Sequence, residues 1–168
     1  GVITIYDNID AEMVAHVRDR LAVARAHKAK ELEIDIQTNG GNVVAGLDIY
    51  DMIRTAPVER RRGLVLGYAH SMGVIILQAC DVREATCNAR FLLHEVLIDE
   101  RISLSILRNQ RKLKKAIEAG GELQRDLEMI LIKRTKRNAA EVRRVCAKDT
   151  EMTAQEALDF GLIDAIRS

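Results

Sequence analysis

Ser71 and His94 are the two residues of this chain whose types and order indicate a chemical reaction. Ser71 lies in a heptapeptide of mostly small residues (67–73), and His94 directly follows an apolar run (91–93). A serine hydroxyl is a poor nucleophile until a positioned imidazole takes its proton, so a hydrolase of this kind needs both groups from elements that meet in space. The pair therefore predicts nucleophilic catalysis, with Ser71 as the nucleophile and His94 as its base.

Two local patterns are expected to position the serine. Leu32 to Gln37 alternates apolar and polar residues, which predicts a strand, and it runs into a turn that contains Gly40 and Gly41. Glycine backbone can approach a ligand closely, so this turn is a candidate oxyanion-hole donor. A second strand over 64–67 leads into an almost wholly apolar helix over 71–79, and a helix with no polar face is buried. Ser71 is expected at this strand-to-helix junction, where backbone N–H groups point toward the hydroxyl.

Strands and helices alternate along the rest of the chain. Further strands are expected over 2–6 and 90–94, and amphipathic helices follow Asp10 and the glycine turn, the second ending at Pro57. The alternation predicts an α/β sheet built of crossover units. From about 101 to 137 the sequence is charged and helical, and Gly120-Gly121 is expected to separate two helices or to mark a bend. Thr153 followed by Glu156 predicts a capping box that opens a short helix ending near Gly161.

Composition excludes several classes of function. The formal net charge of +1 favours neither nucleic acid nor a membrane surface as a partner, and the chain has no apolar run long enough to span a bilayer. Three cysteines fit neither an even disulfide framework nor a paired metal site, which predicts a reducing, cytoplasmic setting. The histidines and cysteines lack the spacing of a zinc site, and no phosphate-binding glycine motif is present. No metal or cofactor is therefore expected.

The order of the Gly-Gly turn, the Ser-Met-Gly helix start, the histidine strand and the terminal stretch 153–164 resembles ClpP, the proteolytic subunit of the Clp protease. The resemblance implies an α/β, ClpP/crotonase-like fold of repeated strand-strand-helix units, in a single peptidase domain over 1–168 with a helical arm over about 101–137. It implies an ATP-independent serine peptidase acting on unfolded proteins or peptides, with the amides of Gly41 and Met72 as the oxyanion hole. It also implies a homo-oligomeric ring and a separate AAA+ unfoldase as a partner.

The third member of a triad is less narrowly defined. Asp149, in front of Thr150, resembles the Asp-Thr pair of the family and gives the chain order Ser, His, Asp. Glu95 and Asp99 are the alternative carboxylates that could orient His94. His70 is a rival base because it adjoins Ser71, although adjacent residues on a turn rarely direct an imidazole at the neighbouring hydroxyl.

Two departures from the family pattern keep other functions open. Asn39 replaces the proline usual before the glycine pair, and no glycine-rich segment follows His94, so ring stacking and the register of bound peptide are open. The chain resembles a divergent member of the family. The alternatives are a crotonase-like acyl-CoA enzyme, which shares the oxyanion scaffold, and an inactive, structural ring subunit.

Overall fold

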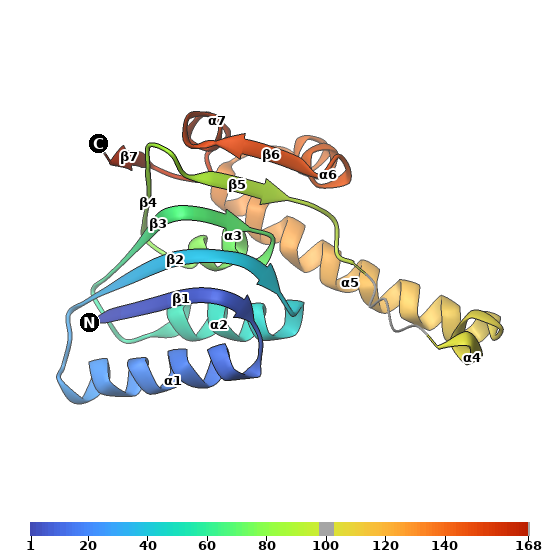
Figure 1. The fold of residues 1–168 in the computed structure, drawn as a ribbon, viewed down its shortest axis with the longest axis horizontal. Helices are drawn as coiled ribbons and strands as arrows, with labels where there is room; N and C mark the ends of the chain where they lie inside the picture. Colours follow the sequence, from blue (N-terminus) through green and yellow to red (C-terminus); the bar gives the residue numbers. More distant parts are fainter. Residues whose placement is uncertain (98–102, 168) are drawn as a thin grey trace.

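The computed structural model describes residues 1–97 and 103–167, and in these residues the chain folds around a mostly parallel sheet with helices packed on it (Figure 1). The main path of the sheet has the order β1-β2-β3-β4-β7, with β5 paired to β3 and β6 paired to β5. All of these pairs are parallel except β5 with β6, so the predicted α/β class is confirmed. The strands are β1 (Val2–Ile9), β2 (Glu31–Gly41), β3 (Arg60–His70), β4 (Val82–Thr86), β5 (Arg90–Leu93), β6 (Thr150–Thr153) and β7 (Ala165–Arg167).

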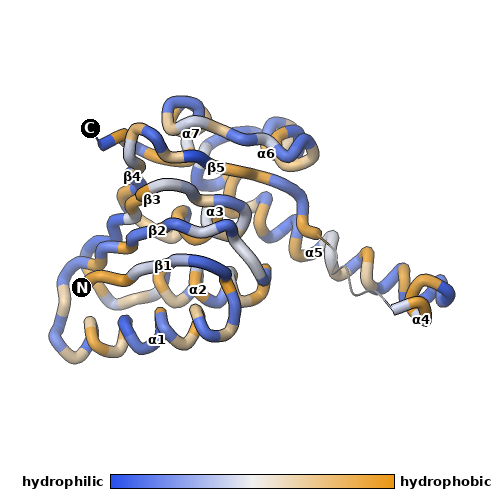
Figure 2. The backbone as a smooth tube through the Cα atoms, in the orientation of Figure 1, coloured by the Kyte–Doolittle hydropathy of each residue, from blue (hydrophilic) through white to orange (hydrophobic). Residues whose placement is uncertain are grey.

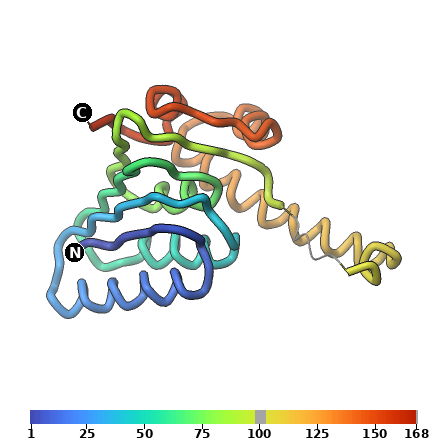
Figure 3. The backbone as a smooth tube through the Cα atoms, in the orientation of Figure 1, coloured from blue at the N-terminus to red at the C-terminus, as the bar shows by residue number. Residues whose placement is uncertain are grey.

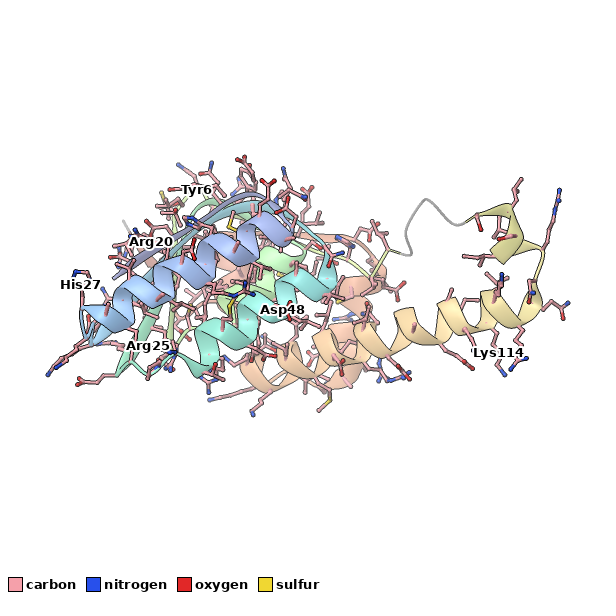
Figure 4. All side chains as sticks on the ribbon, turned by 90° about the horizontal axis from the view of Figure 1, so that it is seen from below. Tyr6, Arg20, Arg25, His27, Asp48 and Lys114 are labelled. Atoms are coloured by element: carbon pink, nitrogen blue, oxygen red, sulfur yellow. The ribbon has the colours of Figure 1, made fainter. Side chains whose placement is uncertain are left out.

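Helices α1 and α2 lie side by side along one face of the sheet, as the view from below shows (Figure 4). The helices are α1 (Ala11–Ala26), α2 (Val43–Thr55), α3 (Met72–Leu77), α4 (Leu104–Leu107), α5 (Gln110–Thr135), α6 (Ala139–Ala147) and α7 (Ala154–Phe160). The predicted caps are confirmed, since the Asp10 side chain accepts hydrogen bonds from the first turn of α1 and Thr153 forms a capping box with Glu156.

The core is aliphatic, as the composition requires. Along β2, the apolar Leu32, Ile34 and Ile36 are buried while the polar residues between them are half-exposed, because successive side chains of a strand point to opposite faces. Each fully buried side chain of this kind stabilises the fold by about 1.5–3 kcal/mol. The apolar face of the sheet packs on the helices, and this fixes which residues of each strand reach the helix layer.

Strand β3 has two neighbours on the same edge, one after the other. Its first half pairs with β4, from Arg62 to Val65, and its second half pairs with β5, from Tyr68 to His70. The sheet therefore divides at β3, and the short β5–β6 pair lies beside the carboxyl end of this strand. Because Ser71 directly follows β3, this division brings the β5 chain next to it.

A long helical arm leaves the sheet (Figure 1). Helix α5 is continuous through Gly120-Gly121, so the predicted separation into two helices at these glycines is wrong. The break lies instead before Asn109, whose side chain caps α5 and separates it from α4. Glycine costs about 1 kcal/mol relative to alanine inside a helix, and the good helix formers on both sides offset this cost. Hydrophilic and hydrophobic segments alternate along the arm (Figure 2), and both chain ends lie at the side opposite to it (Figure 3).

Candidate active site

Ser71 has an unusual backbone conformation at the predicted strand-to-helix junction. Its φ is 52° and its ψ is −118°, a region that non-glycine residues rarely adopt and that costs on the order of 1–3 kcal/mol. The surrounding structure holds it there: the Ser71 N–H donates to the Leu92 carbonyl over 2.8 Å, and the Ser71 carbonyl accepts from Val74 N–H over 3.0 Å. In other hydrolases, a strained strand-to-helix turn of this kind exposes the serine hydroxyl to the substrate-binding site.

The Ser71 hydroxyl is not used to cap the helix that follows it. Ser71 holds the N-cap position of α3, a helix that the structure describes completely, yet its side chain makes no capping hydrogen bond. All six residues of α3 are buried, so the helix is fixed in the core. The hydroxyl is therefore left for another partner at the end of β3.

The Gly40-Gly41 turn packs against this junction. A Cβ atom added at Gly40 would lie 2.6 Å from Ser71 Cβ and 3.1 Å from the amide nitrogen of Met72, so no other residue fits there without a shift. Gly40 also has a φ of +94°, which favours glycine. At Gly41 the close approach is to the end of β1, where an added Cβ would lie 2.4 Å from the Ile9 carbonyl. The turn therefore packs between the end of β1 and Ser71.

His94 follows β5 and reaches the same site. The carbonyl oxygen of Glu95 lies 2.6 Å from His94 Nδ1. A carbonyl only accepts, so Nδ1 carries the hydrogen, and in a neutral imidazole this leaves Nε2 as the acceptor. A histidine in this tautomer has a lone pair available to take a proton from a hydroxyl.

Ser71 and His94 line one small cavity of about 20 Å³. The cavity lies where the ends of β3 and β5 meet α5 and α6, and its other lining residues are Ile75, Leu93, Gln124, Leu127, Glu128, Leu131 and Cys146. The structure therefore brings the predicted nucleophile and base to one site. His70 does not line this cavity.

His70 lies beside the ring of Tyr68, two residues earlier on β3, with the two ring centroids 5.2 Å apart. Burial lowers the pKa of His70, the charge of Glu151 acts to raise it, and that of His94 lowers it further. Tyr68 and His70 are alternate residues of β3, so their side chains point to the same face of the sheet.

Asp149 precedes β6 and comes next in the antiparallel register with β5. Leu93 pairs with Thr150, so the next positions outward are His94 and Asp149. Asp149 is exposed and has a φ of 48°. His94 Nδ1–H donates to the main-chain carbonyl of Glu95, so neither the Asp149 carboxylate nor that of Glu95 receives this hydrogen bond. Asp99, the other alternative, lies outside the described residues.

Three polar or sulfur-bearing residues of the cavity were not predicted from the sequence: Gln124, Glu128 and Cys146. Burial raises the pKa of the Cys146 thiol to about 11, and the charges of Glu128 and Glu95 act in the same direction. One signal was available, since Gln124, Leu127, Glu128 and Leu131 are spaced as one face of a helix. The high charge of this segment hid that face.

Other features of the described residues do not compete with this site. A larger hollow of about 560 Å³ lies between the C-terminal ends of α1 and α2 and contains none of the predicted catalytic residues. No group of three or more His, Cys, Asp or Glu residues in the described ranges could hold a metal ion. None of the helices described there combines the length and apolar character needed to cross a membrane.

Comparison with known proteins gives the same fold and the same family. A structure of a single-residue mutant of ClpP1 from Listeria monocytogenes superposes with a TM-score of 0.87, at 20% sequence identity, covering 99% of this chain and 91% of that chain. At this identity the likeness shows the fold. The model of the Clp protease family matches residues 1–168, the whole of the sequence. The chain therefore belongs to the Clp protease family.

Proposed function

We propose that this protein is a serine endopeptidase that cleaves unfolded proteins or peptides without using ATP itself. The observation that carries the proposal is the placement of Ser71, held at a φ of 52° with no capping bond, at the same small cavity as His94. A strained residue persists where the surrounding structure over-determines it, and such residues cluster at active sites. Membership in the Clp protease family supports a serine protease.

In the proposed mechanism, Ser71 Oγ attacks the peptide carbonyl while His94 Nε2 takes the hydroxyl proton. The same imidazolium then gives the proton to the leaving amine, and a water molecule repeats the sequence on the acyl-enzyme. The amides of Gly41 and Met72 are assigned to the oxyanion. Removing one donor of this kind typically lowers kcat by about 10²–10³.

Asp149 is proposed as the group that orients His94. Its support is the β5–β6 register, which continues from Leu93 and Thr150 to His94 and Asp149. A carboxylate that accepts from Nδ1–H stabilises the imidazolium formed during catalysis. The Glu95 carbonyl bonds the same nitrogen and keeps the same tautomer, but as a neutral acceptor it stabilises that charge less. Transfer of the bond from Glu95 to Asp149 would accompany substrate binding.

We also propose assembly into a homo-oligomeric ring in the cytoplasm, fed by an AAA+ unfoldase. Proteins of this family generally form rings and work with such unfoldases. Exposed apolar side chains on the strands and on the arm would supply contact surface: Val2, Tyr6, Leu66, Leu104 and Leu107. Sedimentation at micromolar concentration tests this assembly, and a strict monomer would contradict it.

The test of the function is active-site labelling. Ser71→Ala should abolish both fluorogenic-peptide turnover and labelling by a fluorophosphonate, because it removes the attacking oxygen, and it should leave the fold and assembly intact, because only this one atom is lost. Ser105→Ala, on an exposed position of α4, is the matched control and should leave both signals unchanged. Labelling that survives Ser71→Ala would refute the assignment. An acyl-CoA enzyme would not require the pair Ser71 and His94, and a structural subunit would give no labelling in the wild type.

A further inference from the structure

The cavity beside Ser71 has a charged wall. Glu128, on α5, is 7% exposed and is among the few charged residues buried in the described part of the chain. Charged side chains are almost never buried unless they are paired. The walls around it include the apolar side chains of Leu127 and Leu131 and the neutral amide of Gln124, so Glu128 is the carboxylate among the residues that line this cavity.

Two donors fix the Glu128 carboxylate and leave part of it available. The Gln124 amide donates to Oε1 over 3.1 Å, and Arg143 Nε donates to Oε2 over 2.9 Å. A carboxylate offers about four acceptor positions, so two stay open. Arg143 reaches in from α6 with a side chain that is 63% exposed, which places its charge partly in solvent while Glu128 stays inside.

Gln124 connects this wall to the base. Its side-chain oxygen accepts from the Val96 N–H over 2.8 Å, two residues after His94, while its nitrogen donates to Glu128. Glu128 is therefore held in a fixed position relative to the segment that carries His94. A fixed carboxylate in a pocket beside a nucleophile discriminates among the side chains that enter the pocket.

The size of the cavity limits what it accepts. About 20 Å³ is room for one water-sized group, since roughly 10–15 Å³ is the least that holds a water molecule. A methyl or hydroxymethyl group fits this space, whereas an aromatic ring or a lysine side chain does not. An aspartate at the same place would bring a second carboxylate beside Glu128, which costs binding energy through like-charge repulsion.

We propose that this cavity receives the side chain on the carbonyl side of the scissile bond and that Glu128 sets its specificity. The preferred side chains are short and uncharged, such as alanine and serine, and acidic side chains are rejected. This inference rests on the proposed peptidase function and adds the substrate class to it.

The test uses fluorogenic peptides that differ only at the residue before the scissile bond, with products checked by mass spectrometry. In the wild type, kcat/KM for alanine or serine should exceed that for phenylalanine or aspartate by about tenfold to a hundredfold, the range that one pocket contact supplies. Equal rates for all four peptides would overturn the inference. This comparison needs no variant and does not depend on a variant folding.

Two variants should change kcat/KM for the aspartate peptide, relative to the alanine peptide, in opposite directions. Glu128→Gln keeps the shape of the wall and removes the charge, so kcat/KM for the aspartate peptide should rise about tenfold relative to alanine, while the size of its side chain still keeps it below alanine. Arg143→Gln leaves the Glu128 charge less compensated and should lower kcat/KM for the aspartate peptide relative to alanine. Glu122→Gln, at an exposed position of the same helix, is the matched control and should change neither ratio. An unchanged aspartate ratio in both test variants would refute the role of Glu128.

A binding measurement separates this inference from the proposed function. Fluorescence anisotropy with Ser71→Ala gives the affinity of product peptides that end in alanine, serine, phenylalanine or aspartate. The predicted order of affinities without any turnover in the wild type would support the pocket and refute the peptidase. Turnover without that order would support the peptidase and refute the pocket.

Discussion

Replacement of Gly40 by alanine tests the geometry of the site with a single methyl group. The added Cβ would lie 2.6 Å from Ser71 Cβ and 2.9 Å from the His70 carbonyl, where ordinary contact begins at 3.4 Å. The site therefore has to move by most of an ångström, against a junction that is already strained. A displacement of about 1 Å in a catalytic group can lower the rate about 10²-fold, so Gly40→Ala should lose about two orders of magnitude in kcat.

The same substitution should also lower stability. Gly40 has a φ of +94°, and a non-glycine residue in such a region costs on the order of 1–3 kcal/mol. Thermal unfolding measures this cost and shows whether the protein is folded at the assay temperature. Activity is read from fluorogenic-peptide turnover and from the rate of fluorophosphonate labelling, both at a temperature where the variant is folded.

Gly121→Ala is the matched control for this experiment. On α5 an added Cβ would meet only the end of the Arg125 side chain, at 3.7 Å, and alanine favours the helix by up to about 1 kcal/mol. The control should therefore keep its activity and unfold at the same or a higher temperature. A folded Gly40→Ala protein with wild-type turnover would refute the argument that the glycine turn positions Ser71.

The other predictions concern the triad, an ion pair and the thiols. Asp149→Asn should leave the fold intact while lowering turnover by up to about 10⁴, and wild-type turnover and labelling rates would exclude Asp149 from the triad. Asp164 is partly buried, which acts to raise its pKa, but the hydrogen bonds and charge of Arg83 hold that pKa below its ordinary value of 3.8. The pair therefore stabilises the fold above about pH 4 and loses this effect as the pH falls through the lowered pKa. Because the Asp164 side chain is 41% exposed and solvent screens the pair, Asp164→Asn should cost only about 1 kcal/mol at pH 7 and progressively less in acid, as measured by urea unfolding. A difference that stays constant down to pH 2 would contradict this. Cys87 is exposed, whereas burial raises the pKa of Cys80 to about 12 and that of Cys146 to about 11. A thiol reagent at pH 8 should therefore react with Cys87 alone in the native protein, and Cys87→Ser should abolish the fast reaction.

The main strands and the nucleophile junction could be predicted from the sequence because their signals are local. Alternation along Leu32 to Gln37 reports a half-buried strand, and the apolar run after Ser71 reports a buried helix. The boundaries differ by a few residues; β2, for example, continues through Gly41 into the predicted turn. The local pattern of apolar residues was sufficient to predict a strand or helix wherever one face of that element packs on the core.

The strands β4, β6 and β7 were missed because their signals are not local. In β4 the charged Arg83 is only 6% exposed. From the sequence alone an arginine is expected at the surface, because its partner Asp164 lies near the end of the chain and their pairing forms only in the folded protein. Glu128 was missed for the same reason, since its partner Arg143 lies on another helix. Burial of charge depends on tertiary pairing, and a single sequence does not show which charges will meet.

The pairing of β5 with β6 has a consequence for the order of folding. Leu93 and Thr150 are neighbours in space, but the whole arm lies between them in the chain, whereas β1, β2 and β3 pair with strands close in sequence. Closing a long loop costs conformational entropy before its contacts form, so the β1–β3 region is expected to fold first. In the proposed mechanism, His94 and Asp149 would then be brought together only after the arm is synthesised and packed. A chain still emerging from the ribosome would carry Ser71 without a complete set of partners, and a nascent peptidase would be silent until the last segment is in place.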